Sequence, residues 1–133
     1  MDVVQRSGKR KTAIARANVR AGKGRIRINK KPIEIWTPDM ARMKMMEPIF
    51  LAGKLVDKVD IDVTIKGGGI IGQADAARTA IANGLVKFYK DKPELRERYS
   101  EYDRSLLVSD SRRKEAKHFL GRGARKKRQK SFR

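Results

Sequence analysis

Residues 58–89 read KVDIDVTIKGGGIIGQADAARTAIANGLVKFY and contain the two clearest structural signals of the chain. In 58–66, β-branched aliphatic side chains alternate with polar or charged ones, which predicts a strand with one packed and one solvated face. From about Gln73 to Tyr89, apolar residues recur every three or four positions, which predicts a helix whose apolar stripe lies on the sheet. The stripe consists of Ala74, Ala77, Ile81, Leu85 and Phe88.

The residues before this unit show a second pattern of alternation. Residues 12–20 lead through 22–24, which contain two glycines, into 25–29, where Arg alternates with Ile. This pattern predicts a β-hairpin with one apolar face and one basic face. Residues 33–36 are predicted to form a brief extended piece.

The remaining elements are predicted to be short. Residues 37–39 are typical of a helix start, and a proline is expected to break the helix that follows, so we predict two short helices joined at Glu47-Pro48. A short charged helix is predicted at 94–99 and a last short strand at 106–108. The sequence therefore predicts an α+β fold in which helices cover one face of a mostly antiparallel, four-stranded sheet.

The distribution of charge divides the chain into a globular body, residues 1–111, and an extended basic tail, residues 112–133. The net charge is +19 over 133 residues. Residues 1–31 and the tail each carry 11 Lys or Arg against one acid, whereas 32–111 carry 12 bases and 13 acids. Only a dense polyanion compensates so much charge in so small a space, which points to nucleic acid.

The basic residues favour phosphate contacts with structured RNA. Residues 7–12 lead into the Arg-bearing strands and should form a fixed cationic face, while Gly121 and Gly123 allow the tail to bend. Few aromatic side chains lie among the basic residues, which makes base stacking on single strands a poor fit.

Several other functions have little support in the sequence. The chain has no cysteine, which excludes disulfides and thiolate zinc sites and leaves a reducing cytoplasm as the default. No segment approaches the roughly 18 apolar residues of a membrane span. The sole histidine, His118, lacks partners for a triad or a metal site, and Asp60 and Asp62 alternate with lysines as on a solvated strand face. We therefore expect no catalysis, cofactor or metal.

Residues 67–72 match the pattern G-x-G-x-x-G between a strand and a helix. A dinucleotide site would need an acid at the end of a second parallel strand, but Asp91 lies in a turn after a helix, and the chain is too short for a doubly wound sheet. The segment is instead interpreted as a turn into a helix N-terminus, whose N–H groups could receive an RNA phosphate.

Four methionines and a tryptophan allow two interpretations. Met40, Met43, Met45 and Met46 could form an adaptable partner surface, but methionines at helical spacing are more often core, and we favour core. Trp36 is likewise predicted to pack rather than to stack on a base.

Four blocks, in order along nearly the whole chain, resemble small-subunit ribosomal protein nine of the archaeal type. The blocks are residues 7–16, residues 22–29, residues 67–69 with 72–74 and Arg78, and residues 110–115 with 124–133. The resemblance implies the fold of the second domain of ribosomal protein five, with a left-handed β-α-β crossover. It also implies a non-enzymatic structural role in the small-subunit head, in the cytoplasm, on ribosomal RNA and beside neighbouring head proteins, without a membrane and without a homo-oligomer.

The resemblance further implies that the tail extends toward the peptidyl site, where its last residues approach the bound tRNA. By position, the tRNA-contacting residues are Lys130, Ser131 and Arg133. Bacterial members usually end Gln-Phe-Ser-Lys-Arg, so Lys130 and Phe132 depart from that pattern and one cation lies two places further inward.

The residues predicted to bind rRNA are basic side chains and the glycine turn. In the body they are Lys9, Arg10, Lys11, Arg16, Arg25, Arg27, Gly67, Gly68, Gly69, Gln73 and Arg78. In the tail they are Arg112, Arg113, Lys114, Lys117, Arg122, Arg125, Lys126, Lys127 and Arg128. Two other classes remain open: a small nucleotide-dependent enzyme that uses 67–72 as a phosphate loop, and a DNA-packaging or membrane-surface protein.

Overall fold

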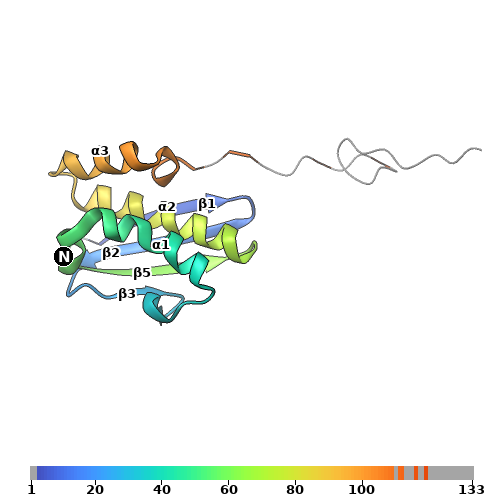
Figure 1. Cartoon of the computed structure of the whole chain (residues 1–133), viewed down its shortest axis with the longest axis horizontal. Helices are drawn as coiled ribbons and strands as arrows, with labels where there is room; N and C mark the ends of the chain where they lie inside the picture. The colour runs from blue at the N-terminus through green and yellow to red at the C-terminus, as the bar shows by residue number, and fades with distance from the viewer. Residues whose placement is uncertain (1–2, 110, 113–115, 117–118, 120–133) are drawn as a thin grey trace, which may run out of the picture.

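The computed structural model describes residues 3–109, 111, 112, 116 and 119, and it has a sheet with helices on one face (Figure 1). The sheet has five strands in the order β1-β2-β5-β3-β4. The strands are β1 (Val4–Arg10), β2 (Ala13–Ala21), β3 (Ile26–Ile28), β4 (Lys31–Pro32) and β5 (Val59–Lys66). The α-helices are α1 (Asp39–Ala52), α2 (Ile70–Phe88) and α3 (Pro93–Tyr102), and the short 3-10 helices are η1 (Ile33–Ile35), η2 (Gly53–Lys58) and η3 (Arg104–Leu106). The predicted α+β class is confirmed.

The unit formed by β5 and α2 follows its sequence pattern closely. The four aliphatic side chains of β5 are buried, whereas the residues between them are half-buried or exposed. On α2, Ala74, Ala77, Ile81 and Leu85 are buried and Phe88 packs against the core. The helix begins at Ile70, three residues earlier than predicted, because Gly69 has extended backbone and serves as its N-cap.

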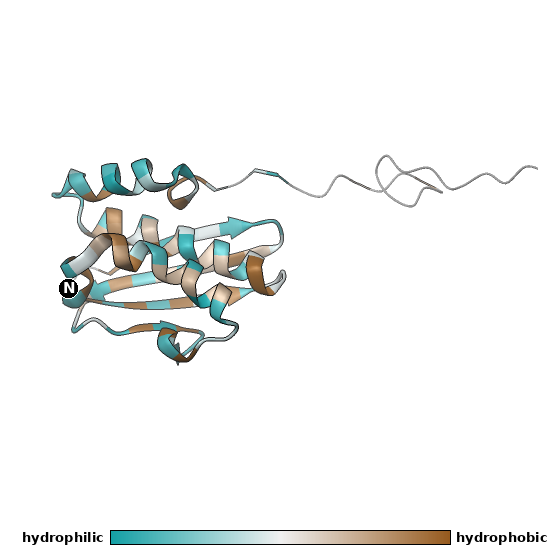
Figure 2. Ribbon diagram, viewed as in Figure 1, coloured by the Kyte–Doolittle hydropathy of each residue, from teal (hydrophilic) through white to brown (hydrophobic). Residues whose placement is uncertain are grey.

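Small side chains bring α2 close to the sheet. Ala13, Ala15 and Ala17 of β2 are fully buried under α2, which itself contributes further alanines to the contact. Gly8 of β1 lies so close to α2 that an added Cβ would stand 2.2 Å from the carbonyl oxygen of Ala76. In Figure 2, apolar residues recur along α2 and along the strands that it covers. The residue sizes thus set the distance between helix and sheet.

The predicted hairpin between 12–20 and 25–29 is wrong. β2 pairs antiparallel with β1 and β5, whereas β3 pairs parallel with β5 and antiparallel with β4. The intervening segment crosses the end of β5, where the N–H groups of Gly22 and Gly24 donate to the carbonyls of Lys58 and Val59 at 3.0 and 2.9 Å. The strands have the predicted apolar and basic faces, but β5 lies between them.

Three further expectations need correction. The sheet has five strands rather than four, because β1 and β4 were not predicted and 106–108 is not a strand. Asp103 accepts a hydrogen bond from the Ser105 N–H at 2.9 Å, which turns the chain into η3 there. The extended piece expected at 33–36 is η1.

Helix α1 is continuous, so the predicted break at Glu47-Pro48 is wrong. Pro48 lies inside the helix and is buried. Its carbonyl accepts a hydrogen bond from the buried hydroxyl of Tyr99 at 2.6 Å, and Arg98 Nη1 donates to the Leu51 carbonyl at 2.6 Å. These contacts from α3 hold the C-terminal half of α1 in place despite the backbone N–H that proline lacks.

The parallel pair β3 and β5 is joined through α1, which gives a β-α-β unit. The resemblance implies such a unit with a left-handed crossover, and the handedness of the crossover stays a prediction. In Figure 1, α1 and α2 lie on the same side of the sheet, so within the described residues no α-helix covers the opposite face.

Candidate nucleic-acid interface

The face of the sheet that no helix covers carries most of the polar side chains of β2 and β5. The register pairs Arg16 with Thr64, Asn18 with Asp62 and Arg20 with Asp60. Because paired residues of adjacent strands point to the same face, these side chains form one surface, hereafter the open face. A shallow hollow of about 300 Å³ on it is lined by Gln5, Ile14, Arg16, Asn18, Thr64 and Lys66.

Two aspartates organise the cations at the β3 side of the open face. Asp62 pairs with Arg27 Nε at 3.0 Å and with Arg20 Nη2 at 3.4 Å, and both arginines remain almost half exposed. Each arginine therefore keeps donors directed to solvent. One carboxylate orients the two arginines while balancing only one of their two charges.

Asp60 binds backbone rather than side chains. Its Oδ1 accepts from the N–H groups of Lys23 and Arg25 at 3.0 and 3.1 Å. These bonds, first that of Arg25 and then that of Lys23, lower the pKa of Asp60 below its usual value, because hydrogen bonds to the ionised form favour it. The predicted site residue Arg25 is thereby held just before β3, on an exposed segment.

The glycine turn after β5 lies against the turn between β1 and β2. Gly67 and Gly68 have φ values of +78° and +71°, and an added Cβ would stand 2.6 Å from the Thr12 carbonyl oxygen at Gly67 and 2.8 Å from the Ala13 Cβ at Gly68. Only glycine fits such a backbone without strain. The turn is thus brought beside Lys11, which is exposed and also has positive φ.

Helix α2 begins directly after this glycine turn. Gly69 supplies no side-chain cap, and Gln73 Nε2 donates to the Gly67 carbonyl at 3.1 Å. The first N–H groups of an α-helix lack partners within the helix and carry a partial positive charge. The predicted residues Lys11, Gly67, Gly68, Gly69 and Gln73 therefore come together at one end of the molecule.

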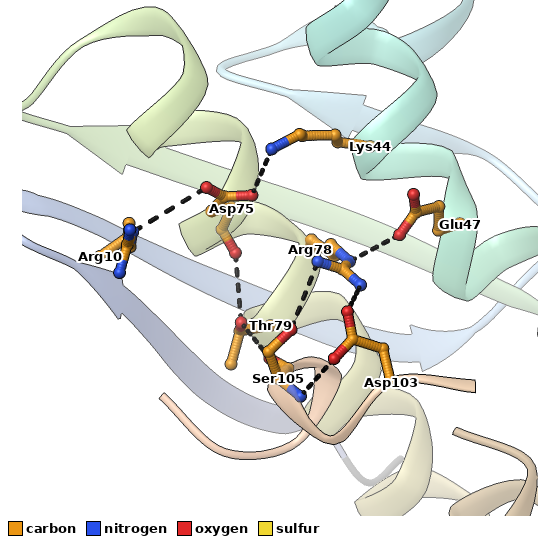
Figure 3. Close-up of polar contacts among 8 residues, drawn as sticks. All are labelled: Arg10, Lys44, Glu47, Asp75, Arg78, Thr79, Asp103 and Ser105. Carbon is orange, nitrogen blue, oxygen red and sulfur yellow. Dashed lines mark hydrogen bonds and ion pairs between the residues drawn. The ribbon is translucent and has the colours of Figure 1, made fainter. Parts of the chain in front are cut away.

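Arg78 has a different environment from the other predicted site residues (Figure 3). Its side chain is only 12% exposed and lies between Glu47 of α1 and Asp103, which follows α3. Nη2 donates to Asp103 Oδ2 at 2.7 Å, whereas Nε lies 2.8 Å from Glu47 Oε2 as an ion pair without hydrogen-bond alignment. The contact with Arg78 and the Ser105 N–H lower the pKa of Asp103. This placement favours a structural role for Arg78.

Other cations near Arg78 also contact carboxylates. Lys44 Nζ is 3.2 Å from Asp75 Oδ1, and the half-buried Arg10 Nε is 4.0 Å from Asp75 Oδ2. A groove of about 240 Å³ runs past these residues and is also lined by Lys9 and Arg112. Lys9 is exposed and pairs in register with Ile14, which places it at the border of the open face.

The open face contains cations that the sequence prediction did not include. Arg20 lies four residues after Arg16 on β2, and Lys66 lies two residues after Thr64 on β5. Both therefore share the open face with Arg16. The period-two alternation that identified Arg16 would have found them. By contrast, the predicted tail residues after Arg112 lie outside the described residues.

The methionines divide between core and surface. Met45 is fully buried and Met46 packs against the core, as predicted. Met40 and Met43 are 64% and 68% exposed, so the prediction of core is wrong for them. Trp36 packs against the core, as predicted.

Membrane-spanning helices and metal sites are both absent from the described part of the chain. It contains no helix long and apolar enough to span a bilayer. Nor does it bring three or more His, Asp or Glu side chains together as a metal site would require.

Comparison with known proteins identifies the family. Residues 8–133 match the family described as ribosomal protein S9/S16. The chain belongs to this family. The ribosomal protein S9/S16 family accounts for the resemblance seen in the sequence, and it makes the chain a structural ribosomal protein rather than an enzyme.

Archaeal relatives match over the full length. The small ribosomal subunit protein uS9 of Methanothrix thermoacetophila is 59% identical over 133 residues and covers 100% of both chains. The proteins of the same name from Halobacterium salinarum and Methanococcus maripaludis are 55% and 51% identical and cover 98–100% of this chain and 99–100% of their own. The predicted archaeal type of this ribosomal protein is confirmed.

Proposed function

We propose that this chain is a structural constituent of the small ribosomal subunit, in the cytoplasm, and that it binds rRNA through the open face and the glycine turn. The observation that carries the proposal is the exposed cation set of the open face, which stands on the sheet and is only partly balanced by Asp60 and Asp62. Cations fixed on strands contact phosphates with little loss of conformational entropy. The names of the full-length relatives support the subunit assignment.

The proposal assigns different tasks to the body, residues 1–111, and the basic tail, residues 112–133. The body docks on folded rRNA in the subunit head. The tail carries 11 Lys or Arg against one acid and extends toward the tRNA in the peptidyl site. Lys130, Ser131 and Arg133 are proposed to approach that tRNA.

Neighbouring head proteins are proposed as further partners, with the chain present as a single copy. Met40, Met43 and Phe50 are exposed on α1, 64%, 68% and 70% respectively. Exposed apolar side chains on one helix are typical of a protein contact rather than of a phosphate contact.

The tail is tested by removing residues 125–133, which deletes six cations. If all six lie on phosphates, the slope of log affinity against log salt for rRNA should fall by about 4–5. The measurement is a salt series of binding to a transcript of the small-subunit head. An unchanged slope would mean that this segment makes no phosphate contact.

The tRNA contact is tested with a chain that lacks only Arg133. Subunits assembled with it should form normally but hold peptidyl-site tRNA more weakly than subunits with the full chain. Sedimentation checks assembly, and tRNA retention on filters checks the contact. Equal retention would contradict the proposed role of Arg133.

The rival functions predict other ligands for the purified chain. A nucleotide-dependent enzyme would bind a nucleotide at 67–72, which isothermal titration of the RNA-free chain would detect. The sheet around this turn is antiparallel between β2 and β5, unlike that of a dinucleotide-binding domain. A DNA-packaging protein would bind duplex DNA as tightly as head rRNA, and a membrane-surface protein would bind anionic vesicles.

A further inference from the structure

A second cationic groove lies on the helix side of the sheet, on the layer opposite the open face. It measures about 460 Å³ and is bordered by β1, the end of α2, the connection to α3, α3 itself and the residues after η3. Eleven residues line it, and they include five cations and no carboxylate. The cations are Arg6, Lys87, Lys90, Lys92 and Arg96. None of these five belongs to the site predicted from the sequence.

These cations have no ion-pair partner within the part of the chain that the structure describes. The side chains of Arg6, Lys87, Lys90 and Arg96 form no ion pair or hydrogen bond there, whereas Lys92 Nζ lies 5.7 Å from the centre of the Tyr89 ring. The carboxylates nearest in sequence do not line the groove. Like charges converging on one hollow raise its potential and favour an anionic ligand.

A purely structural explanation covers only part of this cluster. Lys87 lies in the last turn of α2, where a cation stabilises the helix dipole. Arg6 and Arg96 come from β1 and α3, so that explanation does not apply to them. Their convergence with Lys87 therefore requires a separate reason.

The aromatic ring that lines the groove, that of Tyr89, is already engaged by residues of the chain itself. Val86, Leu107 and Val108 are aliphatic, and Tyr89 is held by its own contacts. The Tyr89 hydroxyl donates to the Leu55 carbonyl at 2.6 Å, and its ring meets Phe88 edge-on at 5.0 Å. A ligand would thus be recognised through its negative charge and not through its bases.

Two separate grooves lie along the helix side of β1, one lined by Arg6 and the other by Arg10. Arg6 and Arg10 lie four residues apart and hence on the same side of the strand, roughly 13 Å from each other at about 3.3 Å per residue. Arg10 contacts Asp75 there, and Arg112 lies near it. Cations spread along a strand suit a polymer with regularly spaced charges better than a short acidic protein segment.

We propose that the groove at the end of α2 binds the sugar-phosphate backbone of a second RNA segment. This inference rests on the proposed function and extends it, because the open face and the groove lie on opposite layers of the body. The body would then bridge two RNA segments instead of resting on one.

The first test compares two charge-matched variants of the full chain. Lys87→Gln removes one groove cation, and Lys54→Gln removes one exposed cation of η2. For head rRNA, the salt slope should fall by about 0.7–0.9 in the groove variant and stay unchanged in the η2 variant. Equal slopes for both variants would overturn the proposal, and circular dichroism checks that each variant is folded.

The second test identifies the occupant in assembled subunits. Because the chain has no cysteine, Val108→Cys, at the groove, can carry a tethered iron chelate that cleaves nearby RNA. Cleavage of rRNA is expected at positions that a chelate on Lys54→Cys does not reach. If a protein segment occupies the groove, the Val108 probe cleaves no RNA and the proposal fails.

The two proposals can fail separately. If the unmodified chain does not bind rRNA, the proposed function itself fails. If the unmodified chain binds rRNA and an Arg16→Gln variant weakens binding while the groove variant behaves like its control, only the groove proposal is overturned.

Discussion

On β2, the side that the helices cover carries small side chains, whereas the side on the open face carries long charged ones. On β2, Ala13, Ala15 and Ala17 point to α2, and Arg16 and Arg20 alternate with them toward solvent. The same period of two therefore separates packing from binding on one strand. The difference teaches that substitutions on the two faces should affect different quantities: stability on one and RNA affinity on the other.

The largest effect is expected at Gly8, where the covered face is tightest. In Gly8→Val the Cβ would stand 2.2 Å from the Ala76 carbonyl oxygen and 2.7 Å from the Ala80 nitrogen, both backbone atoms of α2. We expect the free energy of unfolding to fall by about 3 kcal/mol or more, because the backbone of α2 cannot move away from Gly8 without losing other packing contacts. Urea unfolding measures this loss.

Gly69→Ala is the matched control for Gly8. No atom lies within 4 Å of its added Cβ, and its φ of −92° suits any residue. A loss of less than about 1 kcal/mol is expected at this helix cap. Equal losses at Gly8 and Gly69 would show that close packing of β1 does not set the distance between α2 and the sheet.

A smaller effect is expected for two arginines with opposite roles. Arg78→Gln leaves Glu47 and Asp103 without their partner, and about 2–3 kcal/mol of stability should be lost, with the salt slope for RNA retained. Arg16→Gln on the open face should change stability by less than ~0.5 kcal/mol. Its salt slope for RNA should fall by about 0.7–0.9. The reverse result would contradict the assignment of these two residues.

The smallest effect concerns pH. Arg78 and the Ser105 N–H lower the pKa of Asp103 in the folded chain, so the stabilisation is present above the ordinary value of 3.8 and is lost as pH falls through the folded pKa. Because the Asp103 side chain is 42% exposed, Asp103→Asn should cost less than ~1 kcal/mol near neutral pH. The difference from the unmodified chain should vanish in acid, as urea unfolding over a pH series would show.

Local patterns explain which parts of the fold could be predicted. β5 and α2 were predicted because their apolar residues repeat with strand and helix periods. β1 was missed because the residue that packs under α2 is Gly8, which gives no apolar signal. The pairing of β2 and β3 with β5 depends on residues 35 to 52 positions away, and the glycines at 22–24 imitate a hairpin turn.

In the candidate site, too, local patterns predicted some residues, whereas others depend on contacts between distant segments. The alternation of Arg with apolar residues predicted the exposed positions of Arg16 and Arg27. It gave no information on Arg78, because its partners Glu47 and Asp103 come from distant segments. Arg6 and Arg96 could not be associated from the sequence either, since they share a groove only after β1 and α3 pack on α2.

Asp60 restricts how far the connection between β2 and β3 can vary in length. Its carboxylate spans the N–H groups of Lys23 and Arg25, and an added Cβ at Gly22 would stand 2.2 Å from the Asp60 Cγ. An extra residue between β2 and β3 would displace one of these donors and shift β3 against β5. The connection should therefore tolerate neither insertion nor deletion, unlike most surface loops.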